Sequence, residues 1–188
     1  MSKTLEEQIR DGIKLREAAL ADIPRIEATA RTIAQALRQG RFLYVFGNGG
    51  SAADAQHLAA ELSGKFYKDR EPLPAFALTA NSSAVTAIGN DFGYEHTFSR
   101  QLKGCVRAGD IVIGISTSGT SKNVVEAMEV AKKAGAKTVA LCGRKGKPLA
   151  QMSEHALTVE SDDVARIQEI HEMYYHLLCF AVEKELFD

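Results

Sequence analysis

Five short, nearly continuous apolar runs recur along the chain, separated by longer stretches with the periodicity of helices. Strands that are apolar on both sides are typical of a parallel sheet whose two faces are covered by helices. The sequence therefore predicts an α/β fold of three layers, of the flavodoxin-like or Rossmann-like kind. The expected strands are residues 42–46, 75–78, 111–115, 138–142 and 155–159.

Helical patterns fill the intervals between these strands, as a sheet covered on both faces requires. Each interval has the residue types of a helix, and Gly135 supplies a C-terminal stop for one of them. The expected helices are residues 52–63, 82–89 and 121–134, with a short turn after Pro148. A last long helix is expected after the final strand, at about residues 164–187.

Two more helices are expected before the first strand. The second of them has Pro24 near its first position and stops at Gly40. Because the chain has no internal repeat and no linker-like segment, a single domain is expected over residues 1–188. It consists of an N-terminal helical segment, residues 1–40, and an α/β core with the terminal helix, residues 41–188.

Composition and charge exclude several classes of protein. The chain has 188 residues, of which 45% are hydrophobic, and such a chain can bury the core of one globular domain. Its 23 basic and 24 acidic residues leave a net charge of −1, so no field of one sign attracts nucleic acid or an anionic membrane. No uncharged apolar run of about 18 residues occurs, so we expect neither a signal peptide nor a membrane span.

The cysteines, Cys105, Cys142 and Cys179, are far apart and form no C-x-x-C pair. This spacing indicates neither a disulfide framework nor a cysteine-based zinc site. It fits a protein of the reducing cytoplasm, which is the location that we expect.

The loop after the first expected strand, Gly47 to Ser51, reads GNGGS and opens into a helix. Glycines let backbone amides approach an oxyanion, and a helix N-terminus offers unpaired N–H groups. The loop also fits the G-x-G-x-x-[GA] pattern of dinucleotide sites. That interpretation needs an acidic residue after the second strand, where the chain has only residues 79–82, TANS, so NAD is disfavoured.

The loop after the third expected strand, residues 116–121, reads STSGTS and also runs into a helix. One hydroxyl would be enough to cap that helix, so a cluster of hydroxyls favours a bound phosphate over simple capping. No P-loop lysine pattern occurs in the chain. The hydroxyl residues of interest are Ser116, Thr117, Ser118 and Ser121.

Two helices carry polar residues on one face. His57 and Glu61 are four residues apart, and Gln168 and His176 are eight residues apart on the terminal helix. The two helices could converge on one centre, although a His–Glu pair at this spacing can also be a simple helix contact.

Their neighbours have simpler explanations. Glu169 and Glu172 are expected to be solvated charges, and Tyr174 and Tyr175 to be packing residues. Three histidines have no partner at a spacing that metal or acid–base geometry uses. These, expected to be structural, are His96, His155 and His171.

With these motifs the sequence resembles the phosphoheptose isomerases of the sugar-isomerase (SIS) fold. The resemblance covers nearly the whole chain. It is carried by residues 47–62 (GNGGSAADAQHLAAEL), 87–93 (AIGNDFG), 98–101 (FSRQ), 109–124 (GDIVIGISTSGTSKNV) and 165–176 (ARIQEIHEMYYH). One departure is Lys65, where some relatives have arginine, so that a bidentate fork would be replaced by a point charge.

The resemblance implies an aldose–ketose isomerisation. D-sedoheptulose 7-phosphate would be converted to D-glycero-D-manno-heptose 7-phosphate through an enediol or enediolate, as the first step of heptose nucleotide-sugar biosynthesis for envelope glycans such as the lipopolysaccharide core. It also implies a homotetramer with sites at subunit interfaces, and one zinc ion per subunit.

Site residues are implied position by position. The phosphate would be held by Ser51, Ser116, Thr117, Ser118 and Ser121. The other substrate contacts would be Asn48, Gly49, Gly50, Asn90, Asp91, Glu61 and Gln168. The zinc ligands would be His57, Glu61, Gln168 and His176. Glu61 and His176 would also be the acid–base pair.

These residue types suit the chemistry. Moving a carbonyl between C1 and C2 requires a base for a carbon-bound proton and an acid for the carbonyl oxygen, roles that a carboxylate and an imidazole can fill. A metal could act as a Lewis acid or be partly structural. A phosphate far from the reacting carbons supplies binding energy that holds them in place.

Two other functions remain open from the sequence. The first is a non-enzymatic SIS protein that binds the bacterial replication initiator, and such proteins tend to lack the glutamate and terminal-helix histidine found here as Glu61 and His176. The second is a sugar-phosphate sensor, against which the absence of an appended DNA-binding segment counts.

Overall fold

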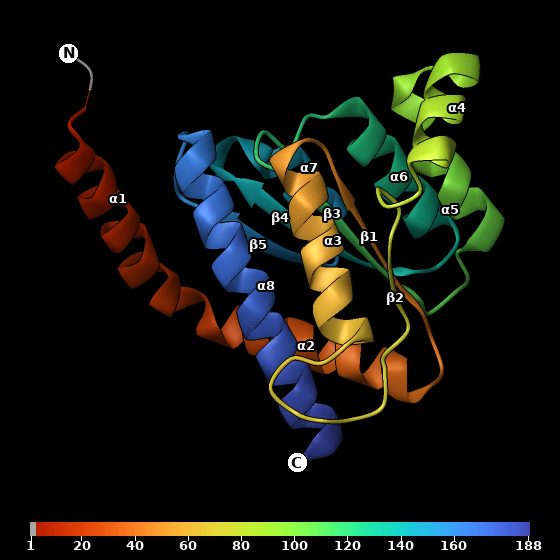
Figure 1. Ribbon diagram of the computed structural model, residues 1–188, viewed down its shortest axis with the longest axis horizontal. Helices are drawn as coiled ribbons and strands as arrows, with labels where there is room; N and C mark the ends of the chain where they lie inside the picture. Colours follow the sequence, from red (N-terminus) through yellow and green to blue (C-terminus); the bar gives the residue numbers. More distant parts are fainter. Residues whose placement is uncertain (1–2) are drawn as a thin grey trace.

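A five-stranded parallel sheet forms the centre of the molecule, in a computed structural model that describes residues 3–188 (Figure 1). The strand order is β2-β1-β3-β4-β5, which is the order of flavodoxin-like folds. Each strand lies within one residue of the bounds predicted from the apolar runs, so the predicted α/β fold is confirmed. The strands are β1 Leu43–Gly47, β2 Ala75–Ala77, β3 Ile111–Ser116, β4 Lys137–Gly143 and β5 His155–Val159.

Helices precede the first strand, connect the strands and follow the last one. They are α1 Leu5–Ala18 and α2 Ile23–Arg38 before β1; α3 Gly50–Ser63, α4 Ser82–Phe92, α5 Ser99–Cys105, α6 Lys122–Lys133 and α7 Lys147–Met152 between strands; and α8 Val164–Phe187 after β5. Three short 3₁₀ turns are η1 Ala19–Asp22, η2 Tyr94–His96 and η3 Arg144–Gly146. Within residues 3–188, no helix is both long and apolar enough to cross a bilayer.

The helices cover both faces of the sheet, because alternate side chains of each strand point to opposite sides. On β3, Ile111 and Ile113 face α2, α3 and α8, and they belong to one hydrophobic core. Val112 faces α5, α6 and α7, and it belongs to a second core. The protein therefore has the three layers that the apolar runs predict (Figure 1).

Two elements before β3, η2 and α5, do not follow from the sequence pattern. α5 has only seven residues and includes Gly104, so its periodicity is too short to recognise. It forms because Phe98 and Leu102 are buried in the same core as residues of α6. The predicted helix bounds were also wrong by two or three residues at two places: α3 begins at Gly50, and α4 continues through Gly89.

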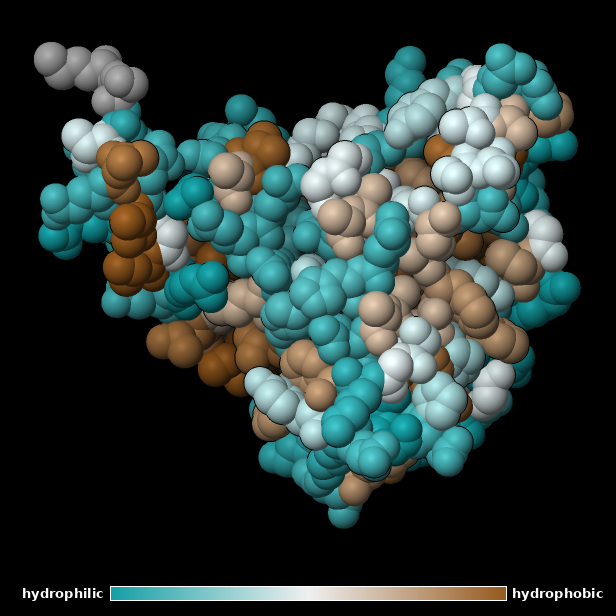
Figure 2. All heavy atoms as spheres, viewed as in Figure 1, coloured by the Kyte–Doolittle hydropathy of each residue, from teal (hydrophilic) through white to brown (hydrophobic). Residues whose placement is uncertain are grey.

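The first helix, α1, extends away from the body of the molecule (Figure 1). Its apolar residues Leu5, Ile9 and Ile13 are 85%, 63% and 50% exposed. Figure 2 shows an apolar band on this helix. A monomeric globular protein rarely exposes such a contiguous apolar stripe, and surfaces of this kind commonly mediate association.

A buried ion pair fixes the long loop between α3 and β2. The Nε of Arg70 donates to the Oε1 of Glu183 at 3.0 Å, and the two side chains are only 3% and 2% exposed. Arg70 also donates to the carbonyl oxygens of Glu61 and Leu62, which end α3. The other carboxylate oxygen of Glu183 accepts from the amide of Tyr67 at 3.1 Å. The pair therefore joins the end of α3, the loop and α8.

Arg70→Met is expected to lower the free energy of unfolding by about 3–5 kcal/mol, because it leaves the Glu183 carboxylate buried without its partner. Urea denaturation followed by circular dichroism measures this change. Arg10→Met is the matched control: it breaks an exposed pair with Glu6, and a change below about 0.5 kcal/mol is expected. Equal stability of the two variants would contradict this role of Arg70.

Candidate active site

Two loops lie side by side where the strand order reverses. β1 lies between β2 and β3, and such a point in an open α/β sheet offers a crevice for ligands at the carboxyl ends of the strands. Gly47 at the end of β1 pairs with Ile115 near the end of β3. The two predicted phosphate loops, residues 47–51 and 116–121, therefore open at the same edge of the sheet.

The first loop depends on two glycines. Gly49 has φ +56°, in the left-handed region that disfavours other residues. A Cβ at Gly50 would lie 2.4 Å from the Nε2 of Gln168 on α8. The chain thus turns directly into α3, which has no side-chain cap, and the amide of Gly50 is left open to an anion because those of Ser51 and Ala52 donate within the turn. Ser51 is only 3% exposed, and its amide donates to the Asn48 carbonyl at 3.0 Å.

The second loop gathers hydroxyls. The Oγ of Ser116 lies 3.5 Å from that of Ser118 and 3.1 Å from that of Ser121. Ser121 is in the N-cap position of α6 but makes no capping hydrogen bond with its side chain. Capping therefore does not explain this hydroxyl, and the amides of Lys122 and Asn123 are open to an anion, whereas that of Val124 donates to the Asn123 side chain. Thr117 is half-buried, and Lys122 adds an exposed ammonium group at the same end.

Three other positions of interest are exposed. Asn90 and Asp91 lie in the last turn of α4, where the Asn90 amide donates to Asp91 at 2.8 Å. Lys65 lies in the loop after α3. In the part of the chain that the structure describes, no side-chain hydrogen bond joins these residues to either phosphate loop.

A cluster of potential metal ligands lies where α3 and α8 run side by side. The Nε2 of His57 is 3.0 Å from the Oε1 of Glu61 and 3.5 Å from the Nε2 of His176. Glu172 joins them, since His57, Glu172 and His176 offer ligand atoms within 4.8 Å of one another. Two imidazole nitrogens bound to one tetrahedral zinc ion at about 2.0–2.1 Å are about 3.4 Å apart. The donor set and its spacing therefore fit zinc.

Aromatic residues hold the two imidazoles. The hydroxyl of Tyr175 lies 2.9 Å from the Nδ1 of His57, and burial raises the pKa of this phenol, so it stays neutral. With Nδ1–H donating to that hydroxyl, the Nε2 lone pair is free for a metal ion; in the other tautomer Tyr175 donates to Nδ1 and the Nε2–H of His57 donates to Glu61. The ring of Phe66 stacks on His176 with 5.8 Å between centroids. Tyr175 is thus both a packing residue, as predicted, and a partner of the site.

Asp54 lies one turn before His57 on α3. Its Oδ2 is buried and has no hydrogen-bond partner among the residues described. Burial, and to a lesser extent the nearby charge of Glu172, raise the pKa of this carboxyl to about 6, while His57 acts in the opposite direction. Asp54 was not predicted from the sequence, although its three-residue spacing from His57 was a usable signal.

The structure places three of the four predicted metal ligands around His57: its Nε2 is 3.0 Å from Glu61 and 3.5 Å from His176. The group whose ligand atoms all lie within 4.8 Å of one another is completed by Glu172 and not by Glu61, and Gln168 packs against Gly50. Gln168 is eight residues before His176, which is about 12 Å along the helix axis. Glu172 is exposed, as the sequence predicts for a solvated charge, yet it lies in the cluster. Its spacing of four residues from His176 repeats that of His57 and Glu61.

The other histidines lie outside this cluster. His96 pairs with Glu126 at 2.9 Å, and His155 lies 3.0 Å from the hydroxyl of Thr32. His171 is fully buried, and burial lowers its pKa to about 4, so the ring is neutral.

Comparison with known proteins gives a consistent result. The family model for the SIS domain matches residues 10–143. A phosphoheptose isomerase of Geotalea daltonii is 48% identical over 188 residues, which cover 100% of this chain and 98% of that protein. The structure of a phosphoheptose isomerase from Neisseria gonorrhoeae has a TM-score of 0.89 at 39% identity, covering 96% of this chain and 100% of that one. That of a phosphoheptose isomerase from Francisella tularensis has a TM-score of 0.92 at 33% identity, covering 96% of each.

Asp54→Asn is expected to stabilise the metal-free protein at pH 8 more than at pH 5. A carboxyl whose pKa is raised to about 6 in the fold costs no stability while it is protonated in both states. Stability falls as the pH rises from the ordinary value of 3.8 to about 6, and the full cost is present above pH 6, where the folded state must bury a charge. At pH 5 only part of this cost is present. We expect a melting temperature about 2–4 °C higher than that of the unmodified chain at pH 8.

The measurement is differential scanning fluorimetry in the presence of a chelator. Asp69→Asn, at an exposed position, is the matched control and should change little at either pH. A gain for Asp54→Asn that is equal at both pH values would show that its charge is not responsible.

Proposed function

Because the chain belongs to the phosphoheptose isomerase family of SIS-domain proteins and is a sugar-phosphate isomerase, we propose that its substrate is D-sedoheptulose 7-phosphate. The product would be D-glycero-D-manno-heptose 7-phosphate. The observation that carries the proposal is that the Nε2 of His57 lies 3.0 Å from Glu61 and 3.5 Å from His176, so that the helices bearing Glu61 and His176 come together at this ring. The reaction would be the first step towards activated heptose for envelope glycans such as the lipopolysaccharide core.

Two proton transfers define the reaction. The Glu61 carboxylate removes a proton from C1 of the ketose while a ring N–H of His176 protonates the carbonyl oxygen on C2, which gives an enediol. Glu61 then returns its proton to C2, and His176 takes the proton of the oxygen on C1, which becomes the aldehyde oxygen. His57, 3.0 Å from Glu61 and fixed by Tyr175, orients the carboxylate.

The phosphate would bind at the hydroxyl loop. Ser121 leaves the amides of Lys122 and Asn123, the first two of α6, without a cap, and Lys122 adds a positive charge, which together support an anion site. Its ligands would be Ser51, Ser116, Thr117, Ser118 and Ser121. The sugar chain would contact Asn48, Gly49, Gly50, Asn90, Asp91 and Gln168.

We propose one zinc ion per subunit, held by His57, Glu61, His176 and a Gln168 side chain. The spacing of 3.5 Å between the two Nε2 atoms supports this set. When bound, zinc supplies a Lewis acid for charge that develops on the sugar oxygens. Glu172 is a second carboxylate within reach of the same centre.

We also propose a homotetramer with sites at subunit interfaces. Glu61 is eleven residues, or about 16 Å of helix rise, beyond Gly50. With C–C bonds of about 1.5 Å, an extended seven-carbon phosphate spans only about 10 Å. The loops and Glu61 of one chain are therefore poorly placed to hold both ends of one substrate. A second copy packed against α3 and α8 would supply the missing part, including Gln168.

Two further features support the proposed assembly and the proposed location in the cytoplasm. The exposed apolar stripe on α1, formed by Leu5, Ile9 and Ile13, is suited to self-association. All three cysteines are free thiols, as expected for the cytoplasm.

Glu61→Gln is expected to lower kcat/KM for sedoheptulose 7-phosphate by about 10²–10⁴-fold, because an amide cannot accept the carbon-bound proton. The protein, either loaded with zinc or treated with a chelator, is incubated with pentulose, hexulose and heptulose phosphates, and the products are identified by NMR. The product panel shows which sugar phosphate is the substrate. Glu129→Gln, exposed on α6, is the matched control. A folded Glu61→Gln protein with the activity of the unmodified chain would refute the proposed role of Glu61.

The interface proposal predicts complementation between inactive subunits. Glu61→Gln and Gln168→Ala proteins should each have little activity, and mixed assemblies should regain part of it, because one shared site then receives intact Glu61 and Gln168 from different chains. Light scattering should give a mass four times that of the 20.4 kDa chain. A monomer, or the absence of activity after mixing, would contradict a shared site.

A further inference from the structure

The side chain of Asn48 is held by residues from two other segments. Its Oδ1 accepts hydrogen bonds from the Nδ2 of Asn123 at 2.8 Å and from the hydroxyl of Tyr94 at 2.9 Å. Its Nδ2 donates in return to the Oδ1 of Asn123 at 2.8 Å. Asn123 belongs to the first turn of α6, and Tyr94 begins η2 just after α4. The three segments that carry the predicted substrate contacts therefore meet at one amide group.

The hydrogen-bonding capacity of this group is almost fully used. Asn123 is 3% exposed, and it also donates to the hydroxyl of Thr97 and accepts from the amide of Val124. The oxygen of Asn48 has two lone pairs, and both are occupied. Of the two N–H groups of Asn48, only one is left. Asn48 can therefore offer a ligand a single donor, in a direction that Asn123 fixes.

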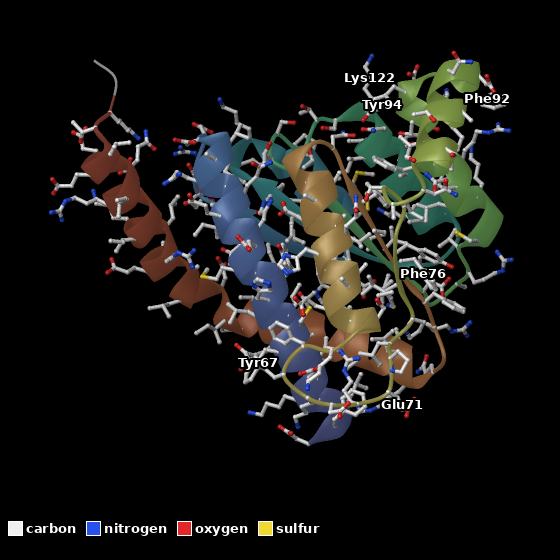
Figure 3. The ribbon with its side chains drawn as sticks, in the orientation of Figure 1. Tyr67, Glu71, Phe76, Phe92, Tyr94 and Lys122 are labelled. Carbon is white, nitrogen blue, oxygen red and sulfur yellow. The ribbon has the colours of Figure 1, made fainter. Side chains whose placement is uncertain are left out.

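Tyr94 supplies the complementary acceptor. Its hydroxyl proton is used on Asn48, so the lone pairs of the oxygen remain available. The residue is 56% exposed, on the wall of a hollow of about 290 Å³. This hollow is lined by Asn48, Tyr94, Glu95, Ser121, Lys122 and Asn123. Figure 3 labels Tyr94 and Lys122 on the same side of the molecule, near α4 and α6.

The hollow thus combines two kinds of polar group. Ser121 and Lys122 belong to the end that suits an anion, and Asn48 and Tyr94 together present one donor and one acceptor. An alcohol group both donates and accepts, so it satisfies this pair. A ligand without a hydroxyl at that place would displace water from both groups without replacing its hydrogen bonds, which is costly.

We propose that Tyr94 and Asn123 are substrate-positioning residues: Asn123 fixes the Asn48 amide, and Tyr94 with Asn48 recognises one hydroxyl of a polyol phosphate close to its phosphate group. The inference rests on the proposed function and deepens it, because it assigns the recognition of the sugar chain to residues that neither transfer protons nor bind the phosphate.

The test compares two tyrosine hydroxyls. Tyr94→Phe removes a hydroxyl from an exposed ring, so the melting temperature should not change. We expect kcat/KM for sedoheptulose 7-phosphate and the affinity for D-glucitol 6-phosphate, which has no carbonyl group, to fall about tenfold, the size of one hydrogen bond. The affinity for inorganic phosphate should stay unchanged.

Tyr174→Phe is the matched control. The hydroxyl of Tyr174 donates to Asp22 at 2.6 Å in a buried position outside the hollow. This variant should lose thermal stability and keep its kinetics and affinities. The two variants are thus expected to give opposite patterns.

A double-mutant cycle tests the shared mechanism. If Asn123 acts through Asn48, the losses in glucitol 6-phosphate affinity from Asn123→Ala and Tyr94→Phe will not add. Unchanged glucitol 6-phosphate affinity in Tyr94→Phe, or a parallel loss of phosphate affinity and melting temperature, would overturn the inference. So would an unmodified protein that binds glucitol 6-phosphate no better than phosphate.

The affinities for glucitol 6-phosphate and phosphate are measured by isothermal titration calorimetry. These measurements do not need turnover, so they separate the inference from the proposed function. A protein that discriminates glucitol 6-phosphate through Tyr94 but isomerises no heptulose phosphate refutes the proposed substrate alone. A protein that isomerises sedoheptulose 7-phosphate equally well with and without the Tyr94 hydroxyl refutes the inference alone.

Discussion

The close approach of α3 to α8 is the contact on which the candidate site depends. Small residues line α3 on this side: Gly50 leaves the space that Gln168 fills, and Ala55 is fully buried in the core that α8 shares. With larger side chains there, the two helices would separate. His57 and His176 come from different helices, and their ring nitrogens lie within 3.5 Å only because the helices are close. The site can therefore form only if α3 and α8 pack closely against each other.

The sequence was sufficient to predict the strands of the sheet, but not to predict which site residues of α3 and α8 lie at the same level. Apolar runs located all five strands because a strand covered on both faces leaves few positions for polar residues. The helix α5 could not be predicted from the sequence, because it is stabilised by Leu102 packed in the core and is too short to show a helical periodicity of apolar residues. The pair His57 and Glu61 was visible as a spacing of four residues. The place of Gln168 depends on the relative level of two helices, which no spacing within one helix reveals.

The site also gathers polar groups that are unfavourable on their own. Asp54 has a buried carboxylate oxygen without a partner, and such a group lowers stability. Arg70 and Glu183, by contrast, satisfy each other and several backbone groups at the far end of α3. The C-terminal end of α3 is thus held by satisfied hydrogen bonds, whereas the buried carboxyl of Asp54 lowers stability nearer its start. Proteins commonly retain such local costs where function requires them.

The parallel alignment of α3 and α8 limits which insertions and deletions the chain can accept. Seven residues separate Gly50 from His57, and eight separate Gln168 from His176. One residue inserted or deleted within either interval would rotate the following side chains by about 100° around the helix axis, which faces the imidazole away from its counterpart. Point substitutions on the outer surfaces of these helices leave the alignment intact. Length variation in descendants of this chain is therefore expected in the loops and not in these two intervals.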